Sequence, residues 1–266
     1  MEHRIDPKEA RSQHDPEYLL SLTLDIAEEM LMSGAEINRV EDTLLRICKA
    51  YEFKKVNVFS ITEFIFVSLL APNGKIITQT RRVYSYNNNL SHLEQLNKLS
   101  RYICTEKPGV SAILDRIELL SQEEPVTPAW VRCLCFMIGG GAFACFFGGN
   151  FLDCIASSLV AIFMYFFGQF SKMQEMNRIA HTVVCSAIAG TLGLFLYTIG
   201  IGSNLDKIMI GNIMLLIPGM VFTNSIRDML CGNIISGLLR LIESLLVAIA
   251  IAVGFSIPLL LIGGSF

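Results

Sequence analysis

The chain has 266 residues, of which 52% are hydrophobic and 17% are charged, and its formal net charge is −3. A mean hydropathy of +0.51 is high for a soluble protein of this length. Residues 1–128 contain 15 Lys and Arg and 19 Asp and Glu, whereas residues 129–266 contain only 6 and 5. This difference predicts a first half in water and a second half in lipid. The negative charge provides no basic surface, which excludes a nucleic-acid-binding protein.

Three parts of the chain follow from this difference. The first is polar, contains proline and lacks the apolar stretch of a secretory signal, so it is expected to be disordered. The second is long enough to form a core of its own. The three parts are a disordered segment at 1–16, a cytoplasmic domain at 17–125 and a transmembrane domain at 126–266.

The cytoplasmic domain changes periodicity along its length. Apolar residues recur at helical spacing in two segments before the strands and two after them, with Gly34 placed to end the first helix. Alternating segments between them predict strands, and Asn73-Gly74 favours a tight primed turn joining the last two. The order α-α-β-β-β-α-α indicates an α+β domain. The predicted helices cover 18–32, 36–51, 90–104 and 110–120, and the predicted strands cover 55–61, 63–70 and 76–83.

Five apolar runs follow, so the predicted fold class is an α-helical integral membrane protein: about five transmembrane helices preceded by an α+β cytoplasmic domain. Most runs reach the roughly 20 residues that cross about 30 Å of hydrocarbon. Basic residues before the first run and in alternate connections place the domain in the cytoplasm and the carboxyl end outside. The predicted spans are about 130–149, 151–170, 179–201, 208–222 and 245–262.

Small residues recur four apart within the apolar runs, where they let helices approach closely in lipid. We expect them to mark contacts between helices rather than a pore lining. The pairs are Gly140 with Ala144, Ser186 with Gly190, Ala189 with Gly193, Ala248 with Ala252, and Ala250 with Gly254.

Signatures of catalysis are missing from the sequence. It contains no GxSxG, HExxH, P-loop or GxGxxG motif, and its four histidines are far apart. The eight cysteines include no CxxC pair and are expected to be reduced thiols. We therefore expect no enzyme, no metal site and no cofactor.

The fourth apolar run contains the most informative segment. Pro218 should kink or break the helix, because it removes a backbone donor and clashes with the preceding turn. Broken backbone at membrane depth is tolerated where protein or a water-filled cavity satisfies it, and transporter sites are often built there. A guanidinium suits a carboxylate better than a neutral solute. The candidate substrate-binding residues are Pro218, Gly219, Thr223, Asn224, Arg227, Asp228, Arg240 and Glu243.

An ion-pair network at the cytoplasmic face would explain the same charged residues. Arg227 could pair with Asp228 or Glu243, and Arg240 with Glu243, three residues later. The two interpretations are compatible, and both remain open at this point.

Two stretches of sequence resemble the threonine/serine exporter family, and the likeness covers about residues 18–262. The first stretch, at 32–43, reads MSGAEINRVEDT and matches the family's Gly-Ala…Arg-Val-Glu start. The second runs from Leu216-Ile217-Pro218-Gly219 through the charged residues above to Glu243. The chain looks closest to the shorter, YjjP-type members, which form half of a two-component exporter.

The resemblance implies export of small carboxylate-bearing solutes, a succinate-like dicarboxylate or threonine and serine, across the bacterial inner membrane. It also implies a separately encoded, YjjB-like membrane partner, and an ion gradient as the energy source. The lipid bilayer is the other expected partner, and a homo-oligomer is compatible with the sequence.

The alternative is a membrane-anchored enzyme or sensor that acts through the soluble domain. Ser60, Thr62 and Glu63 could line a pocket there, although no nucleophile and base are paired in the sequence. Catalytic turnover by the isolated domain would distinguish an enzyme, and solute binding without net flux would distinguish a sensor.

Overall fold

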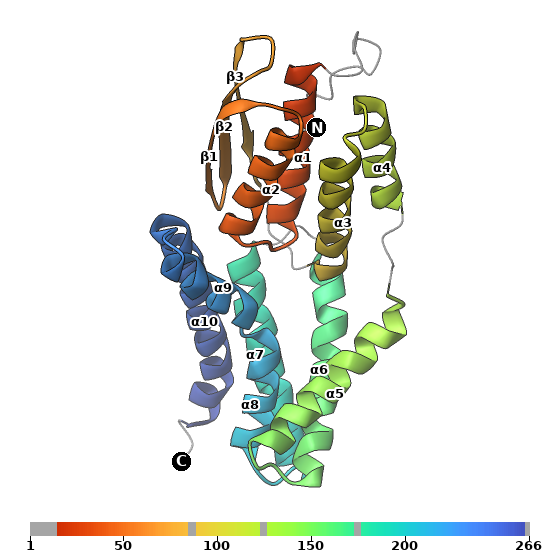
Figure 1. Ribbon diagram of the computed structural model, residues 1–266. Coiled ribbons are helices and arrows are strands. Elements are labelled where there is room, and N and C mark those ends of the chain that lie inside the picture. The colour runs from red at the N-terminus through yellow and green to blue at the C-terminus, as the bar shows by residue number, and fades with distance from the viewer. Residues whose placement is uncertain (1–14, 85–88, 123–126, 173–176, 264–266) are drawn as a thin grey trace. The chain divides into compact units, whose positions relative to one another are not determined.

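The computed structural model describes residues 15–84, 89–122, 127–172 and 177–263. It is mostly helical, with one small sheet near the amino terminus (Figure 1). The chain divides into two compact units. We call residues 1–125 with 223–240 the amino-terminal unit, and residues 126–222 with 241–266 the apolar unit. A segment from the apolar half of the sequence therefore groups with the amino-terminal domain.

The amino-terminal unit has three layers: the sheet, then α1 and α2, then α3 and α4 (Figure 1). The strands are antiparallel in the order β1-β2-β3. The predicted order of helices and strands is confirmed. The bounds are α1 (Pro16–Met32), α2 (Ile37–Ala50), β1 (Lys54–Ile61), β2 (Phe64–Leu70), β3 (Ile76–Arg82), α3 (Leu90–Glu106) and α4 (Val110–Gln122).

Helix α1 has a defined start and end. Of the segment expected to be disordered, residues 1–14 lie outside the described residues, whereas Asp15 caps α1 by accepting a hydrogen bond from the Glu17 N–H. The predicted end at Gly34 is confirmed. Gly34 has a φ of 93°, and the Ala35 N–H donates to the Met30 carbonyl at 3.0 Å. This Schellman motif turns the chain sharply from α1 into α2.

The sheet buries one face against α1 and α2. The buried side chains of β2 alternate along the strand as Ile65, Val67 and Leu69, because successive side chains of a strand point to opposite faces. The turn between β2 and β3 differs from the predicted primed turn. Only Gly74 has a positive φ, and the Ala71 N–H donates to the Lys75 carbonyl, so the loop has three residues with glycine in the left-handed position.

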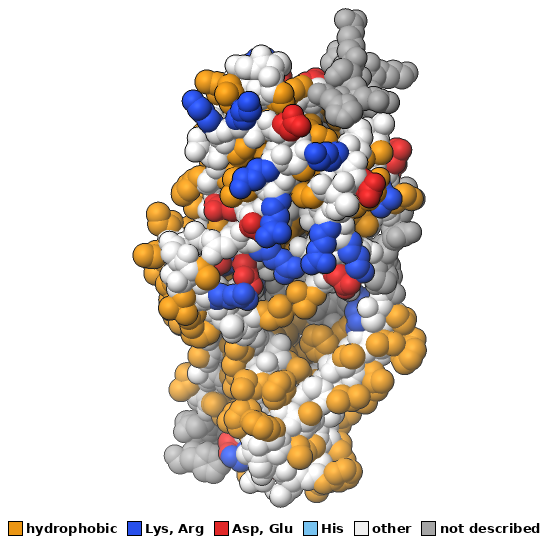
Figure 2. All heavy atoms as spheres, in the orientation of Figure 1, with side chains coloured by type: hydrophobic (Ala, Val, Ile, Leu, Met, Phe, Trp, Pro, Cys, Tyr) orange, Lys and Arg blue, Asp and Glu red, His pale blue; other side chains and the backbone are white. Residues whose placement is uncertain are grey.

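The second half of the chain is a series of apolar helices, as expected of a multi-pass membrane protein. Among the residues that the structure describes, four helices are long and apolar enough to cross a membrane, and α8 with α9 forms a fifth if the bent pair is one span. Hydrophobic side chains cover much of the apolar unit in Figure 2, whereas charged side chains gather on the amino-terminal unit. The bounds are α5 (Ala129–Phe146), α6 (Phe151–Lys172), α7 (Arg178–Thr198), α8 (Leu205–Leu216), α9 (Gly219–Leu230) and α10 (Ile234–Gly263).

Two predicted spans lie within longer helical segments of the structure. The fourth, at 208–222, is two helices that together extend from 205 to 230, because Pro218 interrupts the helix without ending the helical segment. The fifth, at 245–262, lies within α10, which begins at Ile234 and includes the polar residues before 245.

Small residues make the helix contacts of the apolar unit, as predicted for four of the five pairs. A Cβ added at Gly254 would lie 2.4 Å from the Ser186 Cβ, and one at Gly190 would lie 2.9 Å from the Pro258 ring. The exception is the pair Ala248 and Ala252, which is exposed on the outer face of α10. Spacing alone could not show which side of α10 faces another helix.

Candidate functional site

The predicted break at Pro218 is confirmed. Helix α8 ends at Leu216, α9 begins at Gly219, and their axes differ by 55°. Ile217 has an extended ψ of 126°, because a residue before proline is driven out of the helical conformation. A Cβ at Gly219 would meet nothing within 4 Å, so bare backbone is not needed there for packing.

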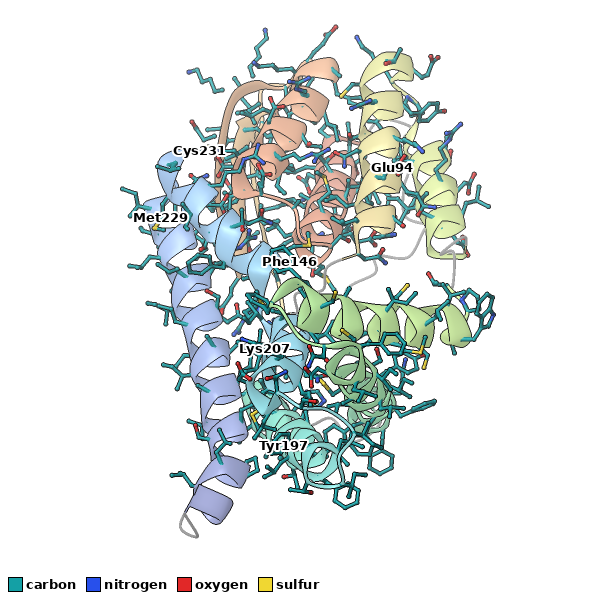
Figure 3. The ribbon with its side chains drawn as sticks, turned by 90° about the horizontal axis from the view of Figure 1, so that it is seen from below. Glu94, Phe146, Tyr197, Lys207, Met229 and Cys231 are labelled. Atoms are coloured by element: carbon teal, nitrogen blue, oxygen red, sulfur yellow. The ribbon has the colours of Figure 1, made fainter. Side chains whose placement is uncertain are left out.

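Helix α9 and the start of α10 form a tight hairpin within the amino-terminal unit. Met229 and Cys231 mark the place where α9 ends and the chain turns into α10 (Figure 3). Gly232 has a φ of 98°, and the Asn233 N–H donates to the Asp228 carbonyl, which closes a second Schellman motif. A Cβ at Gly237 would lie 2.6 Å from the Ser225 carbonyl oxygen, so the helices touch through bare backbone.

A buried ion pair anchors this hairpin to the turn between α1 and α2. The Arg240 Nη1 donates to Asp228 Oδ2 at 3.1 Å, and its Nη2 donates to the Ala35 carbonyl at 3.2 Å. The side chains of Arg240 and Asp228 are only 5% and 2% exposed. The Asp228 carboxylate also accepts a hydrogen bond from the Ile37 N–H, so it caps α2 from a distant part of the sequence.

A second ion pair on the same contact is open to solvent. The Arg227 Nη1 donates to Glu36 Oε1 at 2.5 Å, and the Arg227 side chain is 62% exposed. Beside it, the Asn233 amide donates to Asn38 Oδ1 at 2.7 Å. Glu36 is the N-cap residue of α2, but its side chain makes no capping bond and reaches Arg227 instead.

The expected ion pairs were therefore wrong in their partners. Arg227 pairs with Glu36 and Arg240 with Asp228, whereas Glu243 pairs with Arg178 at 2.5 Å within the apolar unit. The prediction considered only neighbours in the sequence, and the partners of Arg227 and Arg240 include residues about 200 positions earlier.

The other predicted site residues lie at the start of α9. Thr223 is exposed and Asn224 is half-buried, one turn before the two charged residues of that helix. A role in substrate binding remains a prediction for all eight candidates.

Sequence reasoning missed a buried carboxylate in the apolar unit. Asp153, in the first turn of α6, is 0% exposed. It accepts four hydrogen bonds: from the Asn150 N–H at 2.8 Å, the Ser203 N–H at 2.6 Å, and both the backbone N–H and the amide of Asn204, at 2.9 and 2.8 Å. These bonds tie the turn between α5 and α6 to the loop before α8. An ionisable residue at the start of an apolar helix was the available signal.

A second buried polar cluster joins α5, α6 and α8. The Asn212 amide donates to Ser157 Oγ at 3.1 Å, and Ser157 Oγ donates to the Gly140 carbonyl at 2.8 Å. A Cβ at Gly211 would lie 2.5 Å from Ser157 Oγ. The three helices therefore cross where two glycines leave the backbone bare.

Ser60, Thr62 and Glu63 were the residues that could line a pocket in the alternative function, and the contact described for them holds the fold together. Ser60 and Thr62 are buried and Glu63 is exposed. The Ser60 N–H donates to Glu41 Oε1 at 2.8 Å, which fixes α2 to the edge strand β1. Burial raises the pKa of the Glu41 carboxyl above its usual value, and the bond from the Ser60 N–H partly offsets this effect.

Comparison with known proteins identifies the family. Residues 21–262 match the ThrE family, described as "Putative threonine/serine exporter". This chain belongs to that family. No solved structure matches the chain.

Individual relatives are distant and differ in length. The "Probable threonine/serine exporter" of Mycobacterium tuberculosis is 25% identical over 246 residues, which cover 91% of this chain but only 46% of that protein. The "Probable succinate transporter subunit YjjP" of Escherichia coli is 22% identical, over 88% of this chain and 91% of that protein. The protein of the same name from Klebsiella aerogenes is 21% identical, over 88% and 90%. The chain thus spans about half of the first relative and nearly all of the other two.

Proposed function

We propose that this protein is one subunit of an inner-membrane exporter of small carboxylate-bearing solutes, either dicarboxylates such as succinate or threonine and serine. The observation that carries the proposal is the exposed guanidinium of Arg227, two turns after a broken apolar helix. The guanidinium has one hydrogen bond among the described residues and is 62% exposed, so it can accept a further ligand. Its planar fork matches a carboxylate.

The two arginines of the site have different roles in this proposal. Arg240 is buried and bound to Asp228 and Ala35, so it holds the α9–α10 hairpin in place. A buried pair of this kind is costly to break, because the remaining charge would be uncompensated. Arg227 is the residue that contacts the solute, since its guanidinium is exposed and Glu36 occupies only its Nη1.

A separately encoded, YjjB-like membrane protein would complete the exporter. Two observations support a partner: two relatives that match about 88% of this chain over most of their own length are named subunits, and the Mycobacterium tuberculosis relative is about twice as long as this chain. We further propose, from the distribution of basic residues, that residues 17–125 are cytoplasmic and that the carboxyl end is outside. We also propose that an ion gradient drives export, since the sequence contains no P-loop motif for nucleotide binding.

Efflux from cells tests the function. Cells that lack this protein, cells that lack the partner and wild-type cells would be loaded with labelled succinate or threonine, and loss of label would be followed. We expect either deletion to abolish efflux of the exported solute to the same extent. Undiminished efflux without either protein would refute the proposal.

The Arg227→Ala variant tests the site. We expect at least a tenfold loss of flux with an unchanged amount of protein in the membrane, because the carboxylate loses its charged contact. The matched control is Arg46→Ala on α2, whose arginine is also exposed and ion-paired, with Asp42 at 2.8 Å. Wild-type flux in Arg227→Ala would refute a substrate role for this residue.

A further inference from the structure

The contact between Arg227 and Glu36 leaves part of the guanidinium unused. Glu36 takes one bond from Nη1, and this is the only hydrogen bond of the Arg227 guanidinium among the residues that the structure describes. The edge formed by Nε and Nη2 remains available, and this edge can hold a carboxylate by two parallel hydrogen bonds. A solute carboxylate can therefore bind Arg227 while Glu36 stays in contact with Nη1.

Glu36 occupies the N-cap position of α2, although a shorter polar residue would cap the helix better. Ser, Thr, Asp and Asn are the preferred N-cap residues because their short side chains bond the first turn. Glu36 makes no such bond, and the Asp228 carboxylate takes the Ile37 N–H instead. Arg240 fixes the preceding carbonyl, that of Ala35. The backbone before Glu36 is thus anchored, while its carboxylate, 23% exposed, is directed to Arg227.

A ligand bound to Arg227 therefore lies next to both the positive Arg227 guanidinium and the negative Glu36 carboxylate. A carboxylate bound to the open edge of Arg227 lies next to Glu36. A second carboxylate on the same solute would be repelled by Glu36, whereas an ammonium group would be attracted to it. An α-amino acid carries its ammonium one carbon from its carboxylate. Its carboxylate can therefore pair with Arg227 while its ammonium pairs with Glu36.

From this juxtaposition we propose that Glu36 is the residue that determines solute specificity, and that it selects zwitterionic α-amino acids over dicarboxylates. The inference rests on the proposed function, in which Arg227 holds the solute carboxylate. It assigns the ammonium to a residue of the amino-terminal domain that precedes Arg227 by 191 positions. Of the two solute classes considered above, the Arg227–Glu36 pair fits threonine and serine.

Binding and transport by the Glu36→Gln variant test the assignment. The variant keeps the size and hydrogen-bonding atoms of the side chain and removes its charge. Purified full-length protein in nanodiscs would be titrated with L-threonine, L-serine, succinate, and butanoate as a carboxylate without an ammonium. We expect threonine to bind about threefold more weakly and succinate about threefold more tightly, as for the loss of one exposed charge contact. The threonine-to-succinate affinity ratio would fall about tenfold, and butanoate would bind slightly more tightly.

Matched variants separate this effect from a general loss of structure. Glu94→Gln removes an exposed, ion-paired carboxylate on α3 (Figure 3), and we expect it to leave the ratio unchanged. Glu36→Asp keeps the charge, so it should retain the preference for threonine. Equal thermal unfolding midpoints of Glu36→Gln and wild type would show that the fold is intact.

Two results would overturn the role of Glu36: a ratio unchanged in Glu36→Gln, or a wild-type protein that prefers succinate. The failure of the exporter assignment would look different. In that case, efflux from intact cells would not depend on the protein for any solute. If only the role of Glu36 fails, efflux still depends on the protein, and the threonine-to-succinate affinity ratio is the same in Glu36→Gln and wild type.

Discussion

Arg227 and Arg240, which are 13 positions apart, show how burial decides what a residue can do. Arg240 is 5% exposed at its side chain and has a carboxylate and a carbonyl as partners, whereas Arg227 is 62% exposed and has one. The sequence identified both residues as important. It could not distinguish them, because burial depends on the α1–α2 turn, which is about 190 residues earlier in the chain.

The buried pair predicts a large effect on stability. We expect Asp228→Ala to lower the free energy of unfolding by about 3 to 5 kcal/mol, because Arg240 would remain buried without its counter-charge. Thermal unfolding of the full chain in detergent, followed by the fluorescence of Trp130, measures the change. Asp42→Ala, which breaks an exposed pair, should change the free energy by at most about 1 kcal/mol. Equal effects of the two substitutions would contradict the structural role of Asp228.

Asp153 leads to a second prediction at this scale. Each carboxylate oxygen of Asp153 now accepts two hydrogen bonds, and asparagine would replace one of these oxygens with an NH2 group. At least one backbone N–H, either that of Asn150 or those of Ser203 and Asn204, would then lose its bond. We expect Asp153→Asn to lower the free energy of unfolding by about 1 to 3 kcal/mol. Asp206→Asn, at an exposed carboxylate near the same loop, is the control and should be nearly neutral. The same unfolding measurement compares them, and a stable Asp153→Asn would show that the loop does not need the carboxylate.

At the scale of elements, the sequence predicted a helix break or a helix end correctly where one residue causes it through its own backbone. Pro218 breaks the helix and Gly34 ends α1 because each residue restricts or frees its own backbone. The Asn73-Gly74 turn took another form, since a glycine in the left-handed position serves two-residue and three-residue loops equally. The pair Ala248 and Ala252 was predicted to contact another helix but is exposed. The face of a helix that is covered depends on neighbouring helices, and the spacing of small residues does not specify these.

Helix packing in the apolar unit gives a prediction of its own. A methyl group at Gly254 would lie 2.6 Å from the Val183 carbonyl oxygen and 2.4 Å from the Ser186 Cβ, so α7 and α10 would have to separate. We expect Gly254→Ala to destabilise the protein by about 1 to 3 kcal/mol. Gly168→Ala, in a helix where the added methyl meets nothing within 4 Å, should instead stabilise it by about 0.5 to 1 kcal/mol. Thermal unfolding of the pair would show opposite signs, and shifts of the same sign would contradict the packing.

At the scale of the whole molecule, hydropathy predicted the two kinds of environment and most of the helices. It did not predict that residues 223–240 group with the amino-terminal domain. Arg227, Asn233 and Arg240 bond this segment to the start of α2 and the turn before it, and such bonds have no signature in hydropathy.

The proposed orientation can be tested with thiol labelling. In a background without other cysteines, the native Cys231 at the exposed α9–α10 turn should be protected from a membrane-impermeant maleimide in intact cells. Asn150→Cys, at the turn between α5 and α6, should react, because that turn has no basic residue and is placed outside. Permeabilised cells provide the control, in which both cysteines should react. The reverse pattern in intact cells would invert the topology.

The cap that Asp228 provides to α2 has a consequence for biosynthesis. The ribosome completes α2 long before it makes Asp228, since the neighbouring Glu36–Arg227 contact spans 191 residues. During that interval α5 to α8 must be synthesised and delivered to the bilayer. The α1–α2 turn of the amino-terminal domain lacks its contacts with Asp228 and Arg240 throughout this time. A nascent chain stalled before residue 228 would therefore carry an immature domain, which exposes it to proteolytic quality control until translation passes Arg240.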